Sequence, residues 1–307
     1  NGAAKANVPQ TFTSASGGHE DHGNTKTVTP ANHLPLDSHF QDLRIAFGAG
    51  WSQPLAPDLK GNIGGNLSTE YDYTSTGVNL GLSKDLNDKN TTLTMNTSFQ
   101  YDFINPSGGA PVAGSDTAAL QKNGTKTKSI TELMVGVTQI LSPKAFYQFN
   151  YAVSQSQGYL TDPYKYLTVL DTNYQLISKG VADTYTYQYE SRPDEKTRQA
   201  VFNRLKYQIN PQCILDLSHR YTSDNWGIQS NTLDTHWRLS LPSSSYYLEP
   251  HWRWYQQNAA NFFKPYVIHG QAGFASSDPR LGAFTAQTVG GKIAWTMAQD
   301  EEFSIRL

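Results

Sequence analysis

Ionisable side chains recur at every second position in three consecutive segments between residues 213 and 255. At the shared phase, segments 213–222, 232–241 and 246–255 carry three arginines, three carboxylates and two histidines. Alternate residues of a strand point to the same face, so these groups would line one surface. Two kinds of chemistry fit: a charged constriction that selects solutes, or a salt-bridged ladder that braces an enclosed interior, which the near balance of charge favours. The set is Asp216, Arg220, Asp234, His236, Arg238, Glu249, His251 and Arg253.

A second group of candidates lies in the link 157–196, which holds seven tyrosines from Tyr159 to Tyr189. Structureless links of this length are usually functional or mobile. Three interpretations stay open: a constriction folded into the interior, an outer platform for a partner, and a self-packed surface loop. The residues singled out are Tyr159, Asp162, Tyr164, Arg192 and Asp194.

Signals for a bound metal or for catalysis are weak. His19 and His22 have the spacing of metal ligands, but zinc needs three or four ligands, and the Gly- and Asn-rich flanks argue against a specific site. Cys213 is predicted to be inert, and His219 has the outward phase, where it is poorly placed for a Ser–His–acid set. The sequence contains no GxSxG, P-loop or HExxH motif. We therefore predict no enzyme activity, no catalytic residue and no cofactor.

The elements that would position these groups are long alternating segments. In residues 92–103, Leu93, Met95 and Phe99 share one face while threonine, asparagine and glutamine share the other. Segments of about ten residues fit a tilted transmembrane strand, whereas soluble strands are shorter on average. Twelve segments are predicted, near residues 42–51, 63–71, 78–82, 92–103, 133–137, 145–154, 201–209, 213–222, 232–241, 246–255, 289–297 and 303–307.

The links between segments are sorted by length. Links after odd-numbered segments are short, whereas the long links 104–128, 157–196 and 256–284 all follow even-numbered ones. Outer-membrane barrels have short periplasmic turns and longer outer loops. The sequence thus predicts an all-β fold, a transmembrane antiparallel up-and-down β-barrel of about 12 strands, as one domain over residues 1–307. Residues 1–38 would form a Gly-, Ser- and Asn-rich extracellular loop or lead-in, and residues 39–307 the barrel.

Composition excludes other classes of protein. Hydrophobic residues make up 37% of the chain and mean hydropathy is −0.55, and no apolar run reaches the about 20 residues of a membrane helix. The net charge of −2 provides no basic excess for nucleic acid. The aromatic content of 12% suits the aromatic girdles of a barrel.

Several longer motifs carry a family resemblance. They are WSQP at 51–54, STEYDY at 68–73, GYLTDPYK at 158–165, YESRPD at 189–194, DNWGI at 224–228 and YLEPHWRWY at 247–255. Through these motifs, over about residues 1–307, the chain resembles domain-of-unknown-function family 3570, an uncharacterised family of proteobacterial outer-membrane proteins. The resemblance implies further strands on both sides of this sequence and a full barrel of roughly 14 to 16 strands, since the number is expected to be even. It implies a fold and a location but no activity.

The sequence therefore predicts a non-enzymatic barrel in the outer membrane of a Gram-negative bacterium, in contact with lipid and lipopolysaccharide. The leading function is a porin-like conduit for small solutes. The alternative is a plugged barrel that serves as scaffold or anchor for another envelope component, such as a lipoprotein or a cytochrome. A soluble secreted β-protein is the third possibility. The sequence does not identify the solute, the partner or the oligomeric state.

Overall fold

The computed structural model describes residues 10–13, 26–29, 43–106, 109–117, 122–179, 185–240 and 246–295. The alternating segments pair with one another through backbone hydrogen bonds and form one antiparallel sheet of eleven strands. The strands are β3 (Ile45–Ala56), β4 (Leu59–Thr69), β5 (Tyr73–Leu86), β6 (Thr91–Ile104), β9 (Lys126–Ser142), β10 (Ala145–Gly158), β13 (Glu195–Asn210), β14 (Cys213–Asp224), β15 (Gln229–Ser240), β16 (Tyr246–Gln257) and β18 (Phe284–Trp295).

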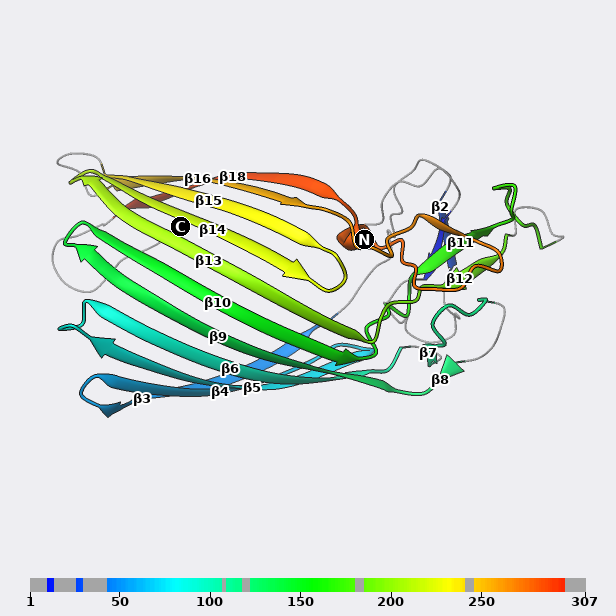
Figure 1. Ribbon diagram of the computed structural model, residues 1–307, viewed down its shortest axis with the longest axis horizontal. Coiled ribbons are helices and arrows are strands. Elements are labelled where there is room, and N and C mark those ends of the chain that lie inside the picture. The colour runs from blue at the N-terminus through cyan, green and yellow to red at the C-terminus, as the bar shows by residue number, and fades with distance from the viewer. Residues whose placement is uncertain are drawn as a thin grey trace.

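The topology of this sheet is up-and-down, because its strands follow one another in the order of the sequence. The short turns after β3, β5, β9 and β13 lie at one end of the molecule, and the three long links lie at the other, together with the short turns β4–β5 and β14–β15 (Figure 1). The first eleven predicted segments correspond to the eleven strands, and the predicted sorting of the links is confirmed. The segment predicted at 303–307 lies outside the described residues.

The exterior of the sheet is apolar. Large apolar side chains at alternate positions are exposed, among them Phe99 at 47%, Trp237 at 40% and Trp252 at 37%. A soluble sheet would bury such side chains, whereas a membrane barrel turns them toward hydrocarbon and satisfies its backbone within the sheet. The predicted outward phase of these strands is confirmed.

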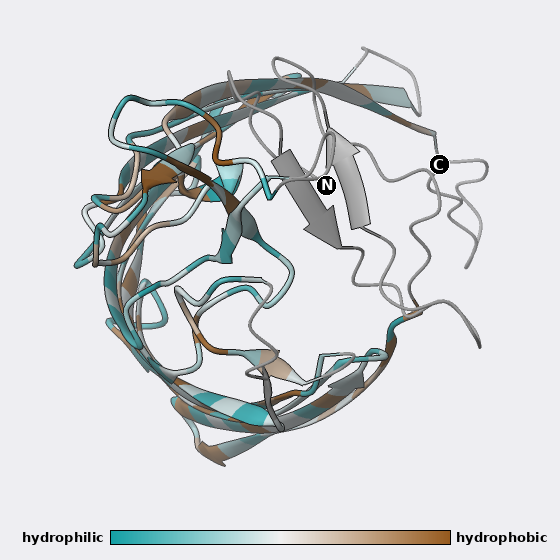
Figure 2. Ribbon diagram, turned by 90° about the vertical axis from the view of Figure 1, so that its right-hand side faces the viewer, coloured by the Kyte–Doolittle hydropathy of each residue, from teal (hydrophilic) through white to brown (hydrophobic). Residues whose placement is uncertain are grey.

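The sheet curls into a barrel wall. Viewed along the long axis, the strands follow most of a circle around an interior space (Figure 2). The two edge strands, β3 and β18, are not paired with each other within the described part of the chain. In that same part, no helix is long and apolar enough to cross a lipid bilayer.

The long links contain secondary structure of their own. In the link 105–125, β7 (Ala110–Pro111) pairs with β8 (Lys122–Asn123). A three-stranded sheet joins the other two links. In it, β11 (Tyr166–Leu170) pairs antiparallel with β12 (Tyr187–Tyr189) and parallel with β17 (Tyr266–Ile268). The 3-10 helix η1 (Pro279–Leu281) follows β17. Near the N-terminus, β1 (Gln10–Thr13) pairs with β2 (Lys26–Thr29).

Most of the buried apolar side chains belong to these links rather than to the barrel. We call the described parts of the second and third long links, residues 159–179, 185–194 and 258–283, the cap. One cluster in the cap centres on Leu167, Val169 and Val267. A second cluster joins the cap to the β14–β15 turn through Trp226 and Phe262, whose rings meet edge to face 5.1 Å apart. The cap is thus a self-packed unit with a dry core, attached to the rim of the barrel.

Candidate functional site

The inward face of β13, β14, β15, β16 and β18 carries the ionisable side chains, and we call it the charged wall. Cross-strand register aligns these residues in rows, because residues directly opposite in an antiparallel pair share a face. Asp216 lies opposite His236, and His236 lies opposite His251. A hollow of about 470 Å³ lies against this wall. Its lining is Phe202, Arg204, Lys206, Ile214, Asp216, Ser218, Asp234, His236, Arg238 and Glu249.

The strongest ion pair of the charged wall joins β13 to β14. Arg204 donates from Nε to Asp216 Oδ1 at 2.8 Å and from Nη2 to Oδ2 at 2.5 Å. This forked geometry is the strong form of an arginine–carboxylate contact. Arg204 was missed by sequence reasoning, although its inward phase follows from the outward Leu205 and Tyr207 beside it.

Two histidines and two carboxylates form a compact group in the middle of the wall. The rings of His236 and His251 are stacked, with centroids 4.1 Å apart and planes 11° from parallel. Asp234 Oδ1 lies 3.0 Å from His236 Nε2 and 3.2 Å from His251 Nε2. Glu249 Oε1 lies 3.7 Å from His236 Nδ1. The structure thus brings together four of the eight predicted residues.

In the part of the barrel that the structure describes, the three predicted arginines do not form the cross-strand salt bridges that a ladder requires. Within the described residues, neither Arg220, Arg238 nor Arg253 has a carboxylate within 4.0 Å. Arg220 lies over the ring of Phe202 at 5.4 Å, and Arg238 lies over Tyr247 at 4.1 Å. Aromatic faces attract guanidinium groups without neutralising their charge. Among the three acids predicted for this wall, Asp216 alone has an arginine partner in the described part of the chain, and that partner is Arg204.

The opposite side of the barrel, the inward face of β4, β5 and β6, is mainly neutral, and we call it the amide wall. Asparagine amides lie over glycines of neighbouring strands. A Cβ at Gly81 would meet Asn96 Oδ1 at 2.2 Å and Asn62 Oδ1 at 2.3 Å, and one at Gly64 would meet Asn79 Oδ1 at 2.5 Å. At these positions the amide occupies the space that a Cβ would need, so a larger residue would have to displace the asparagine side chain. Sequence reasoning missed this pattern, although the alternation of Asn and Gly at inward phase is visible in residues 62–81.

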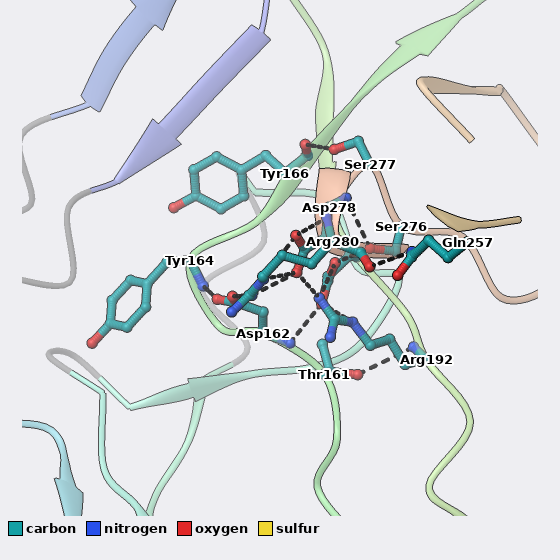
Figure 3. A network of polar contacts seen from close by, with 11 residues as sticks. Thr161, Asp162, Tyr164, Tyr166, Arg192, Gln257, Ser276, Ser277, Asp278 and Arg280 are labelled. Carbon is teal, nitrogen blue, oxygen red and sulfur yellow. Dashed lines mark hydrogen bonds and ion pairs between the residues drawn. The ribbon is translucent and has the colours of Figure 1, made fainter. Parts of the chain in front are cut away.

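The cap is fastened by a buried polar network that links two segments 86 residues apart (Figure 3). Glu190 is fully buried and accepts hydrogen bonds from the hydroxyl of Ser276 and, at 2.6 Å, from the backbone N–H of Asp162. Arg192 places Nη2 2.9 Å from Asp278 Oδ2 and 3.1 Å from Glu190 Oε2. Its Nε lies 2.6 Å from Glu190 Oε1 as an ion-pair contact without hydrogen-bond geometry.

Burial and charge shift the acids of this network in opposite directions. Burial raises the pKa of Glu190, and the repulsion of Asp162 adds to it, while Arg192 and Ser276 oppose it. Burial would also raise the pKa of Asp278, but hydrogen bonds and charge from Arg280 and Arg192 outweigh burial and lower that pKa to about 2. Asp278 is therefore held ionised more firmly than Glu190.

Of the predicted residues in the long link, Asp162 and Arg192 belong to this network. Tyr164 donates its hydroxyl hydrogen to Asp72 on the β4–β5 turn. Tyr159 donates to the carbonyl of Pro111 at 3.3 Å, and Asp194 accepts the backbone N–H of Gly158 with its own carbonyl at 2.8 Å. The network residues that were missed are Glu190, Ser276, Asp278 and Arg280.

A chamber of about 800 Å³ lies between the cap and the barrel wall. Arg44, Glu70 and Lys128 line it from the barrel, and Asp162 and Arg192 line it from the cap. The interior is thus hollow beneath the cap as well as along the charged wall.

The remaining predicted residues are placed as follows. His19 and His22 lie outside the described residues. Cys213 begins β14 beside a short turn and is half-buried. His219 has the outward phase, as predicted, and its Nε2 lies 3.1 Å from Asn231 Oδ1.

Comparisons with known proteins bear on the fold. No curated protein matches the sequence. Among solved structures, a variant of the ferric enterobactin receptor PfeA from Pseudomonas aeruginosa has a TM-score of 0.51 at 10% identity, covering 94% of this chain and 43% of that one. The ferric-catecholate import receptor Fiu from E. coli K12 has a TM-score of 0.40 at 12% identity, covering 89% of this chain and 54% of that one. The siderophore receptor PiuA from Acinetobacter baumannii has a TM-score of 0.41 at 10% identity, covering 97% and 48%.

The chain therefore spans about half the length of these receptors, or less. At such low identity the likeness to PfeA supports the barrel fold alone, and the two weaker likenesses carry no argument. A family model described as a protein of unknown function matches residues 1–307. Because that match covers the whole sequence, this outer-membrane-type β-barrel belongs to domain-of-unknown-function family 3570.

Proposed function

We propose that the protein is an outer-membrane conduit that favours small anionic solutes. The supporting observation is an excess of positive charge on the charged wall. Its inward positions carry twice as many basic as acidic side chains, in contrast with the near balance of the eight residues chosen from the sequence. The basic residues are Lys196, Arg198, Arg204, Lys206, Arg220, Arg238, Arg253 and Lys292, and the acidic ones are Asp216, Asp224, Asp234 and Glu249.

Pairing within the wall leaves that excess in place. Asp216 is paired with Arg204, and Asp224 lies 2.9 Å from Lys196. The arginines that rest on aromatic faces keep their full charge. A cleft lined by one sign of charge and bounded by low-dielectric walls concentrates counter-ions, and charged side chains in a pore select permeant ions by the same effect. The neutral amides of the opposite wall offer hydrogen bonds to a solute without opposing its charge.

The apolar exterior supports placement of the barrel in an outer membrane. Residues such as Val289 at 81% exposed and Ile293 at 65% exposed would meet water in a soluble protein, at a cost of about 25 cal/mol for each Å² of apolar surface. Lipid removes that cost. This supports a membrane location over the soluble secreted alternative.

Conductance of the full-length protein tests the proposal. In planar bilayers with a KCl gradient, we expect stable open steps and a reversal potential that reports a chloride-to-potassium permeability ratio above one. Combined substitution of Arg220→Gln, Arg238→Gln and Arg253→Gln should lower the ratio toward or below one while side-chain size is kept. The matched control is Lys144→Gln, which removes one positive charge at an exposed turn outside the wall. Cation preference in the unsubstituted protein would refute the proposal.

The cap favours a second candidate function, a scaffold for another envelope component. It is a packed unit at the mouth, and Tyr174 and Phe274 project from it at 64% and 49% exposed. Electrical silence in bilayers, together with a partner that co-purifies with the native protein and is lost on Tyr174→Ser substitution, would favour the scaffold. Open steps with no such partner would favour the conduit.

A further inference from the structure

The histidine group of the charged wall has the arrangement of a metal site. We infer that Asp234, His236 and His251 bind a transition-metal dication of the zinc or nickel type, which nothing in the family resemblance implies. The inference concerns the three side chains themselves and holds whether the barrel is an open conduit or a scaffold.

The strand register brings the ligands together, next to an interruption of the β15–β16 ladder at Pro250. His236 on β15 and His251 on β16 are directly opposite each other, and Asp234 precedes His236 by two residues on the same face. One ligand atom from each of the three side chains lies within 4.8 Å of the other two. The cross-strand pair of histidines and the aspartate two residues before His236 therefore supply three ligands from two strands. Three protein ligands are typical of a zinc site whose fourth coordination position is open to water or substrate.

The distances fit a metal at the point where the three groups meet. Two ligand atoms about 2.1 Å from a tetrahedral ion are about 3.4 Å apart. Asp234 Oδ1 lies 3.0 Å from Nε2 of His236 and 3.2 Å from Nε2 of His251. Both imidazoles thus direct the same nitrogen at the same carboxylate oxygen. Coordination requires the stacked rings to tilt away from their 11° angle, because lone pairs of parallel rings do not converge.

Glu249 lies beside Nδ1 of His236, within ion-pair distance but beyond hydrogen-bond distance. Its Oε1 lies 3.7 Å from Nδ1 of His236. A carboxylate at Nδ1 favours the proton on that nitrogen and leaves the lone pair of Nε2 free for a metal. Such partners orient the ring and increase its basicity.

Surrounding charge sets the expected affinity. Arg253 lies opposite Asp234, and Arg238 follows His236 by two residues on the same face. These cations oppose a dication, and the ligand side chains are 22% to 40% exposed. We expect one ion per chain with a Kd of about 10 µM, well above that of a closed structural zinc site.

Metal binding by the full-length protein in detergent, purified without an oligohistidine tag and stripped with chelator, tests the inference. Titration calorimetry with ZnCl₂ should give one site. His251→Gln should abolish it, and Asp234→Asn should weaken it at least tenfold. His219→Gln is the matched control, because His219 lies on the outward face of the adjacent strand, and it should leave binding unchanged. A combined His19→Gln and His22→Gln substitution separates this site from those two histidines and should also leave binding unchanged.

A second measurement needs no substitution. Zinc should protect His236 and His251, but not His219, from diethyl pyrocarbonate in the unsubstituted protein, as read by mass spectrometry. Unchanged zinc binding in a folded His251→Gln protein, loss of binding in the combined His19 and His22 variant, or equal modification of His236 with and without zinc would each overturn the inference.

Discussion

Replacing Arg192 with methionine tests how the cap is held on the barrel. The side chain of Arg192 is 10% exposed, and those of Glu190 and Asp278 are 0% and 1% exposed. Removing one member of a buried ion pair typically costs about 3–5 kcal/mol, because the remaining charge is left unpaired in a medium that solvates it poorly. Asp278 keeps Arg280 as a partner. The uncompensated charge is therefore that of Glu190.

Proton uptake by Glu190 limits the size of this loss. A carboxyl group with an ordinary pKa of 4.5 takes up a proton at pH 7 at a cost of about 1.36 kcal/mol for each pH unit, or about 3 kcal/mol in all. We therefore expect Arg192→Met to destabilise the cap by about 3 kcal/mol at pH 7 and by less than about 1 kcal/mol at pH 5. The loss shrinks in acid because protonated Glu190 no longer needs a cation.

Hydrogen exchange of β11 measures this loss directly, since Leu167 and Leu170 are buried at the centre of the cap. A loss of about 3 kcal/mol corresponds to a roughly hundredfold lower protection factor at pH 7. Lys179→Met is the matched control: it removes a cation 3.5 Å from Asp116 in an exposed ion pair, which is worth about 0–1 kcal/mol. A loss below tenfold at pH 7, or a loss that is equal at pH 5 and pH 7, would refute this reasoning.

Three further predictions concern acid, the amide wall and the lipid face. In the unsubstituted protein, the pKa of Asp278 is lowered to about 2 from an ordinary 3.8, so ionised Asp278 contributes stability above about pH 4 that is lost as the pH falls toward 2. Protection of the cap amides from hydrogen exchange, corrected for intrinsic exchange rates, should therefore persist down to about pH 4 and then decline. Gly81→Ala should lower the free energy of unfolding in a urea titration by about 1–3 kcal/mol, because the new Cβ displaces the amide of Asn96. Gly48→Ala is the control and should cause no such loss, because its Cβ would meet only a backbone oxygen at 3.8 Å. Phe99→Arg should cost about 2–4 kcal/mol in lipid, measured by the same titration, because this outward position lies near the middle of β6; no loss would contradict the lipid-facing assignment.

The strands of the barrel could be predicted because their signal is local. Each strand alternates within itself, and a period of two assigns every side chain to a face without knowledge of its partner. The inward phases of Asp234, His251 and Arg253 followed from this alone. Arg204 was missed because the alternation before it is weak: Phe202 has the inward phase and Asn203 the outward phase.

Which residues pair across the barrel was not predictable in the same way. Equal numbers of acids and bases suggested a ladder, but pairing depends on diagonal neighbours and on aromatic partners such as Tyr247, which the alternation does not specify. The cap network was less predictable still. Glu190 contacts Ser276, and Arg192 contacts Asp278, across a separation of 86 residues that includes four strands of the barrel. Contacts that depend on the folding of two long loops leave no periodic trace in either loop.

Burial separates the charges that hold the structure together from those that face the interior of the barrel. A barrel with a lipid-facing exterior and a wet interior has little dry core, so the cap contains most of the deeply buried ionic contacts, and each of them must be paired to offset desolvation. On the charged wall, Arg253 and Arg238 are exposed and have no acidic partner among the residues that the structure describes. Substitution there should change the field in the interior with little effect on folding, whereas substitution of Arg192 should do the reverse. The two kinds of charge can therefore vary independently: the fold fixes the residues of the cap network, whereas it leaves the charges of the wall free to change.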